Sequence, residues 1–304
     1  MAVAIAVGMV KLIAISLFLA ACGVDPGTGG GSGSGSGSGS DMDGFTTLVS
    51  SDWTLPASTE EYLCVRLTVQ TDTYISAIKP ISPPGTHHSV LMAGPSDGKM
   101  DGTTQCDSTL SQPSIYASGV GTDELDLPDG VAIHLTPGEQ ILLNLHLFNA
   151  TDSEMTGTSG IQIVQVDASA VEHVAGVLLA GKAKGLVVPP MASTQTGTCT
   201  TPDGMTMFAA APHMHLLGTY MTATYTPPGG QPQTMIDQSY SFDAQKYVMQ
   251  TPEVVTQAGG QFTINCTYFN PTPDDVLFGE STTDEMCFAL TMVYPVQPSD
   301  ECTK

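Results

Sequence analysis

The stretch ILLNLHLFNA, residues 141–150, has the alternation that predicts a half-buried β-strand. Successive side chains of a strand point to opposite faces, so one face would carry Ile141, Leu143, Leu145 and Leu147 and pack in a core. The other face would carry Leu142, Asn144, His146 and Phe148. His146 is therefore expected to point away from the main core, on a rigid strand. A lone histidine in such a place is more often a hydrogen-bonded structural residue than a ligand.

Short alternating runs fill the rest of the chain, with Pro, Gly, Asp and Thr between them and almost no helical periodicity. This pattern predicts an all-β protein of sandwich or jelly-roll architecture. The further runs are YLCVRLTV (62–69), YISAIKPI (74–81), HHSVLMAG (87–94), GIQIVQVDA (160–168), MTMFAAAP (205–212), QFTINCTYF (261–269) and CFALTMVY (287–294).

The folded part predicts two domains, residues 45–169 and 170–304. About 260 residues exceed one ordinary sandwich and suit two domains of ~130 residues each. The boundary is placed near residue 170 because the segment 166–193 is rich in small residues and carries Pro189-Pro190, which break the strand rhythm.

The N-terminus has the pattern of an export signal followed by a tether. Residues 1–21 combine Lys11 with a short apolar run, and Leu19-Ala20-Ala21-Cys22 resembles the bacterial lipobox, in which the cysteine is lipidated. A plainly cleaved signal is the alternative. The Gly/Ser-rich residues 22–44 are expected to be a flexible linker. We therefore expect an exported protein, lipid-anchored to the cell envelope and touching the membrane only through its N-terminal lipid.

The composition excludes some classes of partner and site. The chain has 30 Asp and Glu against 8 Lys and Arg, and Arg66 is its one arginine, which argues against nucleic-acid binding. Without Cys22, the cysteines are Cys64, Cys106, Cys199, Cys266, Cys287 and Cys302. An even number in an exported protein predicts up to three disulfides. No CxxC motif occurs, so a thiolate zinc site is not expected.

Two motifs bring histidines together. APHMHLLG, residues 211–218, places His213 and His215 on one face if the segment is extended. GTHHSV, residues 85–90, holds His87 and His88, which would face opposite ways on a regular strand. Binding one metal with both would require a turn or bulge, which the preceding Pro83-Pro84-Gly85 makes plausible.

A methionine precedes the last apolar run. In DEMCFALTMVYP, residues 284–295, one face would carry Met286, Phe288, Leu290 and Met292, and the opposite face Cys287, Ala289, Thr291 and Val293. Methionine is usually core filler, but its thioether suits Cu(I). Five histidines with a candidate methionine and no thiolate motif favour copper or zinc.

The order of these motifs resembles that of the copper type II, ascorbate-dependent monooxygenases. The chain has YLC at 62–64, HH at 87–88, NLH at 144–146, HMH at 213–215 and DEMC at 284–287, and the likeness runs from about Glu61 to Tyr294. The resemblance implies two jelly-roll domains, each holding one of two coppers, that face a solvent-filled cleft. It also implies hydroxylation of a C–H bond with O2 and with ascorbate or another one-electron donor.

The resemblance also implies residue roles. His87, His88 and His146 would hold an electron-transfer copper, and His213, His215 and Met286 the copper that binds dioxygen. His134 and His173 match no ligand position and are expected to be structural or surface residues. The implied disulfides are Cys64–Cys106, Cys199–Cys302 and Cys266–Cys287.

Substrate contacts of the peptide-amidating branch are absent. Where that branch has an arginine, an asparagine and a tyrosine, this chain has Ala211, Phe288 and Leu290. With Met292, the latter two would form an apolar wall, and Tyr62 would help line the cleft. A small neutral or apolar substrate is therefore expected. The alternatives are a copper-binding or copper-buffering lipoprotein without turnover, and a metal-free surface sandwich for adhesion.

Overall fold

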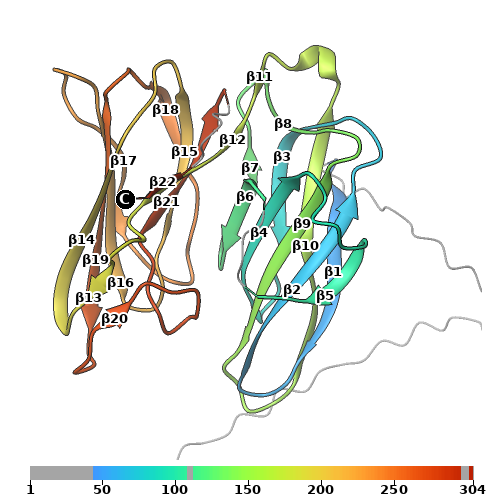
Figure 1. Ribbon diagram of the computed structural model, residues 1–304, viewed down its shortest axis with the longest axis horizontal. Coiled ribbons are helices and arrows are strands. Elements are labelled where there is room, and N and C mark those ends of the chain that lie inside the picture. Colours follow the sequence, from blue (N-terminus) through green and yellow to red (C-terminus); the bar gives the residue numbers. More distant parts are fainter. Residues whose placement is uncertain (1–43, 108–111, 296–300, 304) are drawn as a thin grey trace, which may run out of the picture. The chain divides into compact units, whose positions relative to one another are not determined.

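Strands make up most of the chain in the computed structural model, which describes residues 44–107, 112–295 and 301–303. Within these ranges the one helical element is the 3-10 turn η1, Ala168–Ala170 (Figure 1). The predicted all-β class is thus confirmed. The predicted signal, Cys22 and nearly all of the predicted linker lie outside the described residues. In the part that is described, no helix is long and apolar enough to cross a membrane.

The first half of the folded chain forms two sheets. One has the order β1-β10-β3-β8-β11, with β7 also paired to β3; its strands are β1 (Thr46–Leu55), β3 (Thr73–Ile81), β7 (Leu125–Asp126), β8 (Val131–Leu135), β10 (Met155–Val166) and β11 (His173–Val174). The other has the order β5-β2-β9-β4-β6; its strands are β2 (Thr59–Thr68), β4 (Thr86–Gly94), β5 (Gly102–Gln105), β6 (Ser114–Gly119) and β9 (Gln140–Asn149).

The second half forms two larger sheets and one small one. The order β18-β15-β21-β12-β22 joins β12 (Gly176–Gly181), β15 (Thr206–His213), β18 (Val248–Val255), β21 (Phe288–Tyr294) and β22 (Glu301–Thr303). The order β14-β19-β16-β17 joins β14 (Met191–Thr200), β16 (Gly218–Thr226), β17 (Gln233–Ser239) and β19 (Gln261–Asn270). The small sheet pairs β13 (Val187–Val188) with β20 (Val276–Leu277).

The two halves repeat one strand order. Across the sheets, the neighbouring strands β1-β10-β3-β8 of the first half correspond to β12-β21-β15-β18 of the second. In the same way, β2-β9-β4-β6 correspond to β14-β19-β16-β17, and each strand has the same rank along the chain as its counterpart. The corresponding strands β9 and β19 are followed by loops of the same kind. In each loop the last residue of the strand, Asn149 or Asn270, accepts a 2.7 Å hydrogen bond from the hydroxyl of the threonine two residues later. The predicted domain limits, 45–169 and 170–304, stay a prediction, and the described chain belongs to one compact unit.

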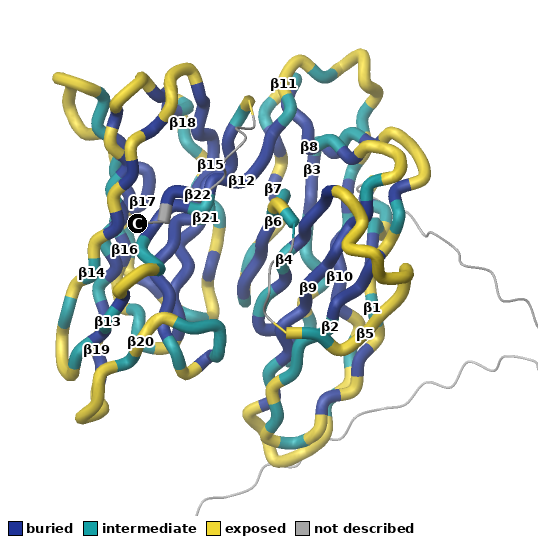
Figure 2. The backbone as a smooth tube through the Cα atoms, in the orientation of Figure 1, coloured by how far each residue is buried: buried dark blue, intermediate teal, exposed yellow. Residues whose placement is uncertain are grey.

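Strand β15 of the second half is buried on both faces. Met207 and Ala210 of β15 lie in the core between the two sheets of the second half. Phe208 and Ala209 of the same strand lie instead in the core of the first half. Every residue of β15 is therefore buried, which is why its sequence is apolar with little alternation (Figure 2).

Strand β9 has the two faces expected from its alternation. Leu143 and Leu145 lie in the core of the first half, whereas Leu142 belongs to a separate cluster with Cys64 and Met92. On the second face, the Asn144 side chain donates to the backbone oxygen of Asp107 at 2.9 Å. This face carries His146.

The three disulfides implied by the resemblance are present: Cys64–Cys106, Cys199–Cys302 and Cys266–Cys287. Disulfides are typical of proteins that fold in an oxidising, exported environment.

The one tryptophan of the chain supports the turn before the histidine pair. Its indole nitrogen donates to Ser159 Oγ at 2.7 Å. Added Cβ atoms at Gly85 and Gly157 would lie only 2.6 and 2.5 Å from the ring of Trp53. The ring therefore fills a slot that two glycines leave open.

We expect Gly157→Ala to lower the free energy of unfolding by about 1–3 kcal/mol, because the added methyl group overpacks this slot. Tryptophan fluorescence during urea denaturation measures the change, since Trp53 is the single tryptophan. Thr156→Val, at the exposed neighbouring position, is the control. Equal midpoints for both variants would contradict the prediction.

Candidate metal centre

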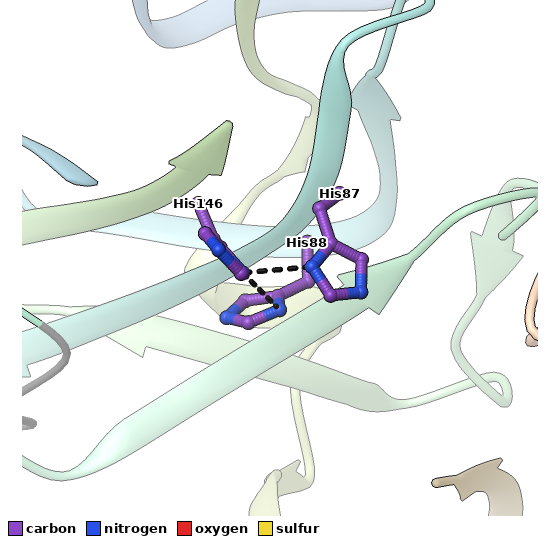
Figure 3. A group of neighbouring side chains, drawn as sticks. All are labelled: His87, His88 and His146. Carbon is purple, nitrogen blue, oxygen red and sulfur yellow. Dashed lines mark hydrogen bonds between the residues drawn. The ribbon is translucent and has the colours of Figure 1, made fainter. Parts of the chain in front are cut away.

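A β-bulge brings His87 and His88 to the same histidine. On the central strand β9, Thr86 pairs with Leu147 and His88 pairs with His146, so the register shifts at His87. The Nδ1 atoms of His87 and His88 lie 2.8 and 3.3 Å from Nδ1 of His146 (Figure 3). One ligand atom from each ring lies within 4.8 Å of the others. The irregularity that the sequence requires for a shared site is thus confirmed.

The outer nitrogen of His146 is held by a carboxylate. Glu60, on the neighbouring strand β2, places Oε1 2.5 Å from His146 Nε2. Because an ionised carboxylate only accepts, Nε2 carries the proton and Nδ1 presents its lone pair to the other two rings. The Tyr62 ring stacks on the His146 ring with centroids 4.2 Å apart. Tyr62 thus lies beside the first histidine set, near the place that the resemblance implied.

The second histidine set lies at and just beyond the end of β15. The rings of His213 and His215 are 5.4 Å apart, while the intervening Met214 is fully buried in the second core. Both Nδ1 atoms meet oxygens that can only accept: Gln245 Oε1 at 2.8 Å from His213, and the Asp284 backbone oxygen at 3.1 Å from His215. Both rings therefore keep Nε2 free as a lone-pair donor.

Glu285 ties Met286 to the His215 segment. Its carboxylate accepts hydrogen bonds from the backbone N–H groups of His215 at 3.0 Å, Leu217 at 2.7 Å and Met286 at 3.2 Å. The Tyr268 hydroxyl donates to the Met286 backbone oxygen at 2.6 Å, and Cys287 is bonded to Cys266. Burial raises the pKa of Glu285 to about 7, although these backbone donors act against the shift.

The two histidine sets lie close together. Ring centroids are 5.9 Å apart for His87 and His215, and 6.0 Å apart for His88 and His213. The resemblance implied a solvent-filled cleft between the two sites, and these ring distances leave little room for one. The physical reason is that hydrogen bonds join the two halves around the rings, such as that from Tyr62 Oη to the Glu280 backbone oxygen at 2.9 Å.

Burial keeps the five imidazoles neutral. Desolvation lowers the pKa of His87 to about 2 and those of His213 and His215 to about 4. It takes the pKa of His88 well below its ordinary value, and it lowers that of His146 although Glu60 opposes this shift. Neutral imidazoles at pH 7 can all act as ligands.

The donor set fits a soft or borderline metal ion. Nε2 of His87 and Nε2 of His215 are buried and have no hydrogen-bond partner within the described residues. Buried polar atoms are rarely left without a partner, so these two nitrogens point to a bound group. Imidazoles suit copper, and so would the thioether of Met286, whose backbone Glu285 ties to the His215 segment.

The other two histidines lie apart from this centre. His134 is 2.8 Å from Asp72 Oδ1 and stacks on Tyr74, and His173 stacks on Tyr294. Their predicted structural or surface role is confirmed. Sequence reasoning missed Glu60, Gln245 and Glu285. A signal was present for two of them, since Glu285 is part of the recognised DEMC motif and Glu60 stands two residues before the YLC motif.

The predicted substrate wall runs along β21. Phe288 pairs with His213, Leu290 with Ala211, and Met292 with Ala209. Leu290 is partly exposed, whereas Phe288 is 5% exposed and Met292 is fully buried in the first core. A role of these three residues in substrate binding stays a prediction.

We expect Glu285→Leu to lower the free energy of unfolding by about 2–4 kcal/mol. The variant keeps much of the side-chain volume but removes the acceptor of three backbone N–H groups, and each buried donor left without a partner costs about 1–3 kcal/mol. Part of this loss is offset because leucine does not have to bury a carboxyl group. Urea denaturation of the metal-free protein measures the change. Glu280→Gln, in the same segment, is the control, and an unchanged midpoint for Glu285→Leu would refute the bracing role.

Comparison with models of protein families finds a match in the C-terminal part of the chain. Residues 173–304 match the model of the copper type II ascorbate-dependent monooxygenase C-terminal domain. This segment contains His213, His215, Met286 and the residues that brace them. As the resemblance suggested, this C-terminal part of the chain belongs to the copper type II, ascorbate-dependent monooxygenase family.

Proposed function

We propose that the chain is a dicopper monooxygenase that hydroxylates a C–H bond of a small neutral or apolar substrate. Dioxygen would supply the inserted oxygen atom, and ascorbate or another donor would supply single electrons. The two halves with their repeated strand order would be two jelly-roll domains with one copper each. The carrying observation is that the outer nitrogens of His146, His213 and His215 are held by acceptors, so their free nitrogens can bind a metal.

The chain divides the work between two ligand sets. His87, His88 and His146 would hold one copper, and His213, His215 and Met286 the other. Copper bound by these ligands would supply one-electron redox chemistry and activation of dioxygen. The protein would hold the rings in one tautomer and exclude water from them, since His146 and His215 are fully buried.

Apolar residues beside the second set support an apolar substrate. Phe288 of β21 pairs directly with His213 of β15. Phe278, which is 37% exposed, packs edge-on against the Phe288 ring with centroids 6.0 Å apart. The one arginine of the chain, Arg66, is engaged by Asp97 at 2.8 Å. It is therefore not free to clamp a substrate carboxylate.

We expect reconstituted protein to bind two coppers per chain, with a Cu–S contribution in X-ray absorption of the ascorbate-reduced form. Met286→Ile should remove that contribution and abolish hydroxylation while keeping copper at the three-histidine site. The control is Met100→Ile, at a methionine that is 88% exposed.

Wild-type turnover by Met286→Ile would contradict the ligand assignment. Two coppers with uncoupled oxygen consumption and no hydroxylated product would favour the copper-buffering alternative. Failure to bind copper would refute the proposed function.

We expect His146→Ala to block repeated turnover while copper remains at the second set, because the electron-storing site loses its central imidazole. Stopped-flow oxidation of the reduced variant, compared with steady-state turnover, separates the two effects. His134→Ala removes a histidine outside the centre and is the control. Unchanged multiple-turnover rates in His146→Ala would refute the division of roles.

A further inference from the structure

Glu60 connects a histidine of the first set to the second half of the chain. Its Oε1 atom meets His146 Nε2 and also accepts hydrogen bonds from Thr282 N at 3.2 Å and Thr282 Oγ1 at 3.0 Å. Ser281 Oγ lies 3.5 Å from the other carboxylate oxygen. The position of the carboxylate therefore depends on the segment that leads to Glu285 and Met286.

Gln245 makes the reverse connection. Its Nε2 donates to the Phe242 backbone oxygen at 3.0 Å, which turns Oε1 toward His213 and fixes the proton of His213 on Nδ1. Its backbone is held by the first half: N donates to the Val120 oxygen at 3.0 Å, and its own oxygen accepts from Thr122 Oγ1 at 2.6 Å.

The first half leaves room for this glutamine. A Cβ atom at Gly119 would lie 2.6 Å from the Gln245 amide, and one at Gly121 would lie 2.5 Å from the Asp243 backbone oxygen. Gly121 also has φ +75°, which other residues rarely adopt. Gln245 itself is 2% exposed, so its contacts with both halves are shielded from water.

We infer that Glu60 and Gln245 are positioning residues that make the imidazole orientation of each histidine set depend on contact with the opposite half. The first half sets His213 through Thr122 and Gln245, and the second half sets His146 through Thr282 and Glu60. Both rings are thus oriented as ligands only when the two halves are docked. That these rings bind copper rests on the proposed function, whereas the crossed dependence does not.

The test uses the metal-free full chain with 15N-labelled histidine. Long-range 1H–15N NMR reports which ring nitrogen carries the proton. The wild type should show His146 protonated on Nε2 and His213 on Nδ1. Thr122→Val should mix the tautomers of His213 and leave His146 unchanged. Thr282→Val should mix those of His146 and leave His213 unchanged. Thr198→Val, an exposed strand threonine, is the control.

A second measurement uses copper titration of the full chain. Gln245→Ala should weaken copper binding at the His213 set about 10–100-fold and spare the three-histidine set. Loss of the hydrogen-bond partner of a metal-binding histidine typically lowers metal affinity by this factor. Glu60→Gln should instead weaken copper binding at the three-histidine set and spare the His213 set. Glu61→Gln should bind copper at both sets as the wild type does.

The outcomes separate the two proposals. Unchanged tautomers in both threonine variants, or equal disturbance of all five histidines, would overturn the crossed dependence. The crossed NMR pattern in a chain that binds no copper would uphold it while refuting the proposed function.

Discussion

The pairing of β9 with β2 and β4 is the constraint on which the centre depends. It places Tyr62 and His88 on either side of His146, with Glu60 two residues further along β2 and within reach of the His146 ring, and the bulge at His87 adds the third imidazole. A regular ladder would turn one histidine of the adjacent pair into the core, since neighbouring side chains alternate. One displaced residue in the register thus converts an ordinary sheet surface into a three-imidazole cluster.

Burial gives these side chains their chemical character. Imidazoles in water are partly protonated near neutral pH, whereas desolvation lowers the pKa of each histidine in the cluster. Burying an imidazole without hydrogen-bond partners would be unfavourable. Acceptors on the outer nitrogens of His146, His213 and His215 replace one of the hydrogen bonds that each ring would make to water. The free nitrogens of His87 and His215 remain, which is the arrangement expected of a site completed by a metal.

The second half reaches the first through an apolar sheet and a few hydrogen bonds. Three residues of the second half bury apolar area in the core of the first half: Phe208, Ala209 and Met292. This burial favours docking of the two halves but does not fix their relative orientation, because the hydrophobic effect is non-directional. Direction comes from the bonds of Glu60 to Thr282 and of Gln245 to Val120 and Thr122. Because these residues also hold His146 and His213, the contacts that dock the halves would also orient the ligands.

The sequence by itself determined the all-β class, the two faces of β9 and the need for a bulge at His87, because side-chain alternation is a local property of the chain. The order of motifs led to the family and to the disulfide pairs. Polar strands such as β14 went unpredicted because their exposed threonines carry no apolar period. Only the tertiary structure decided that Glu60 and Gln245 hold the histidines and that the two sets lie together, because those contacts join residues distant in sequence.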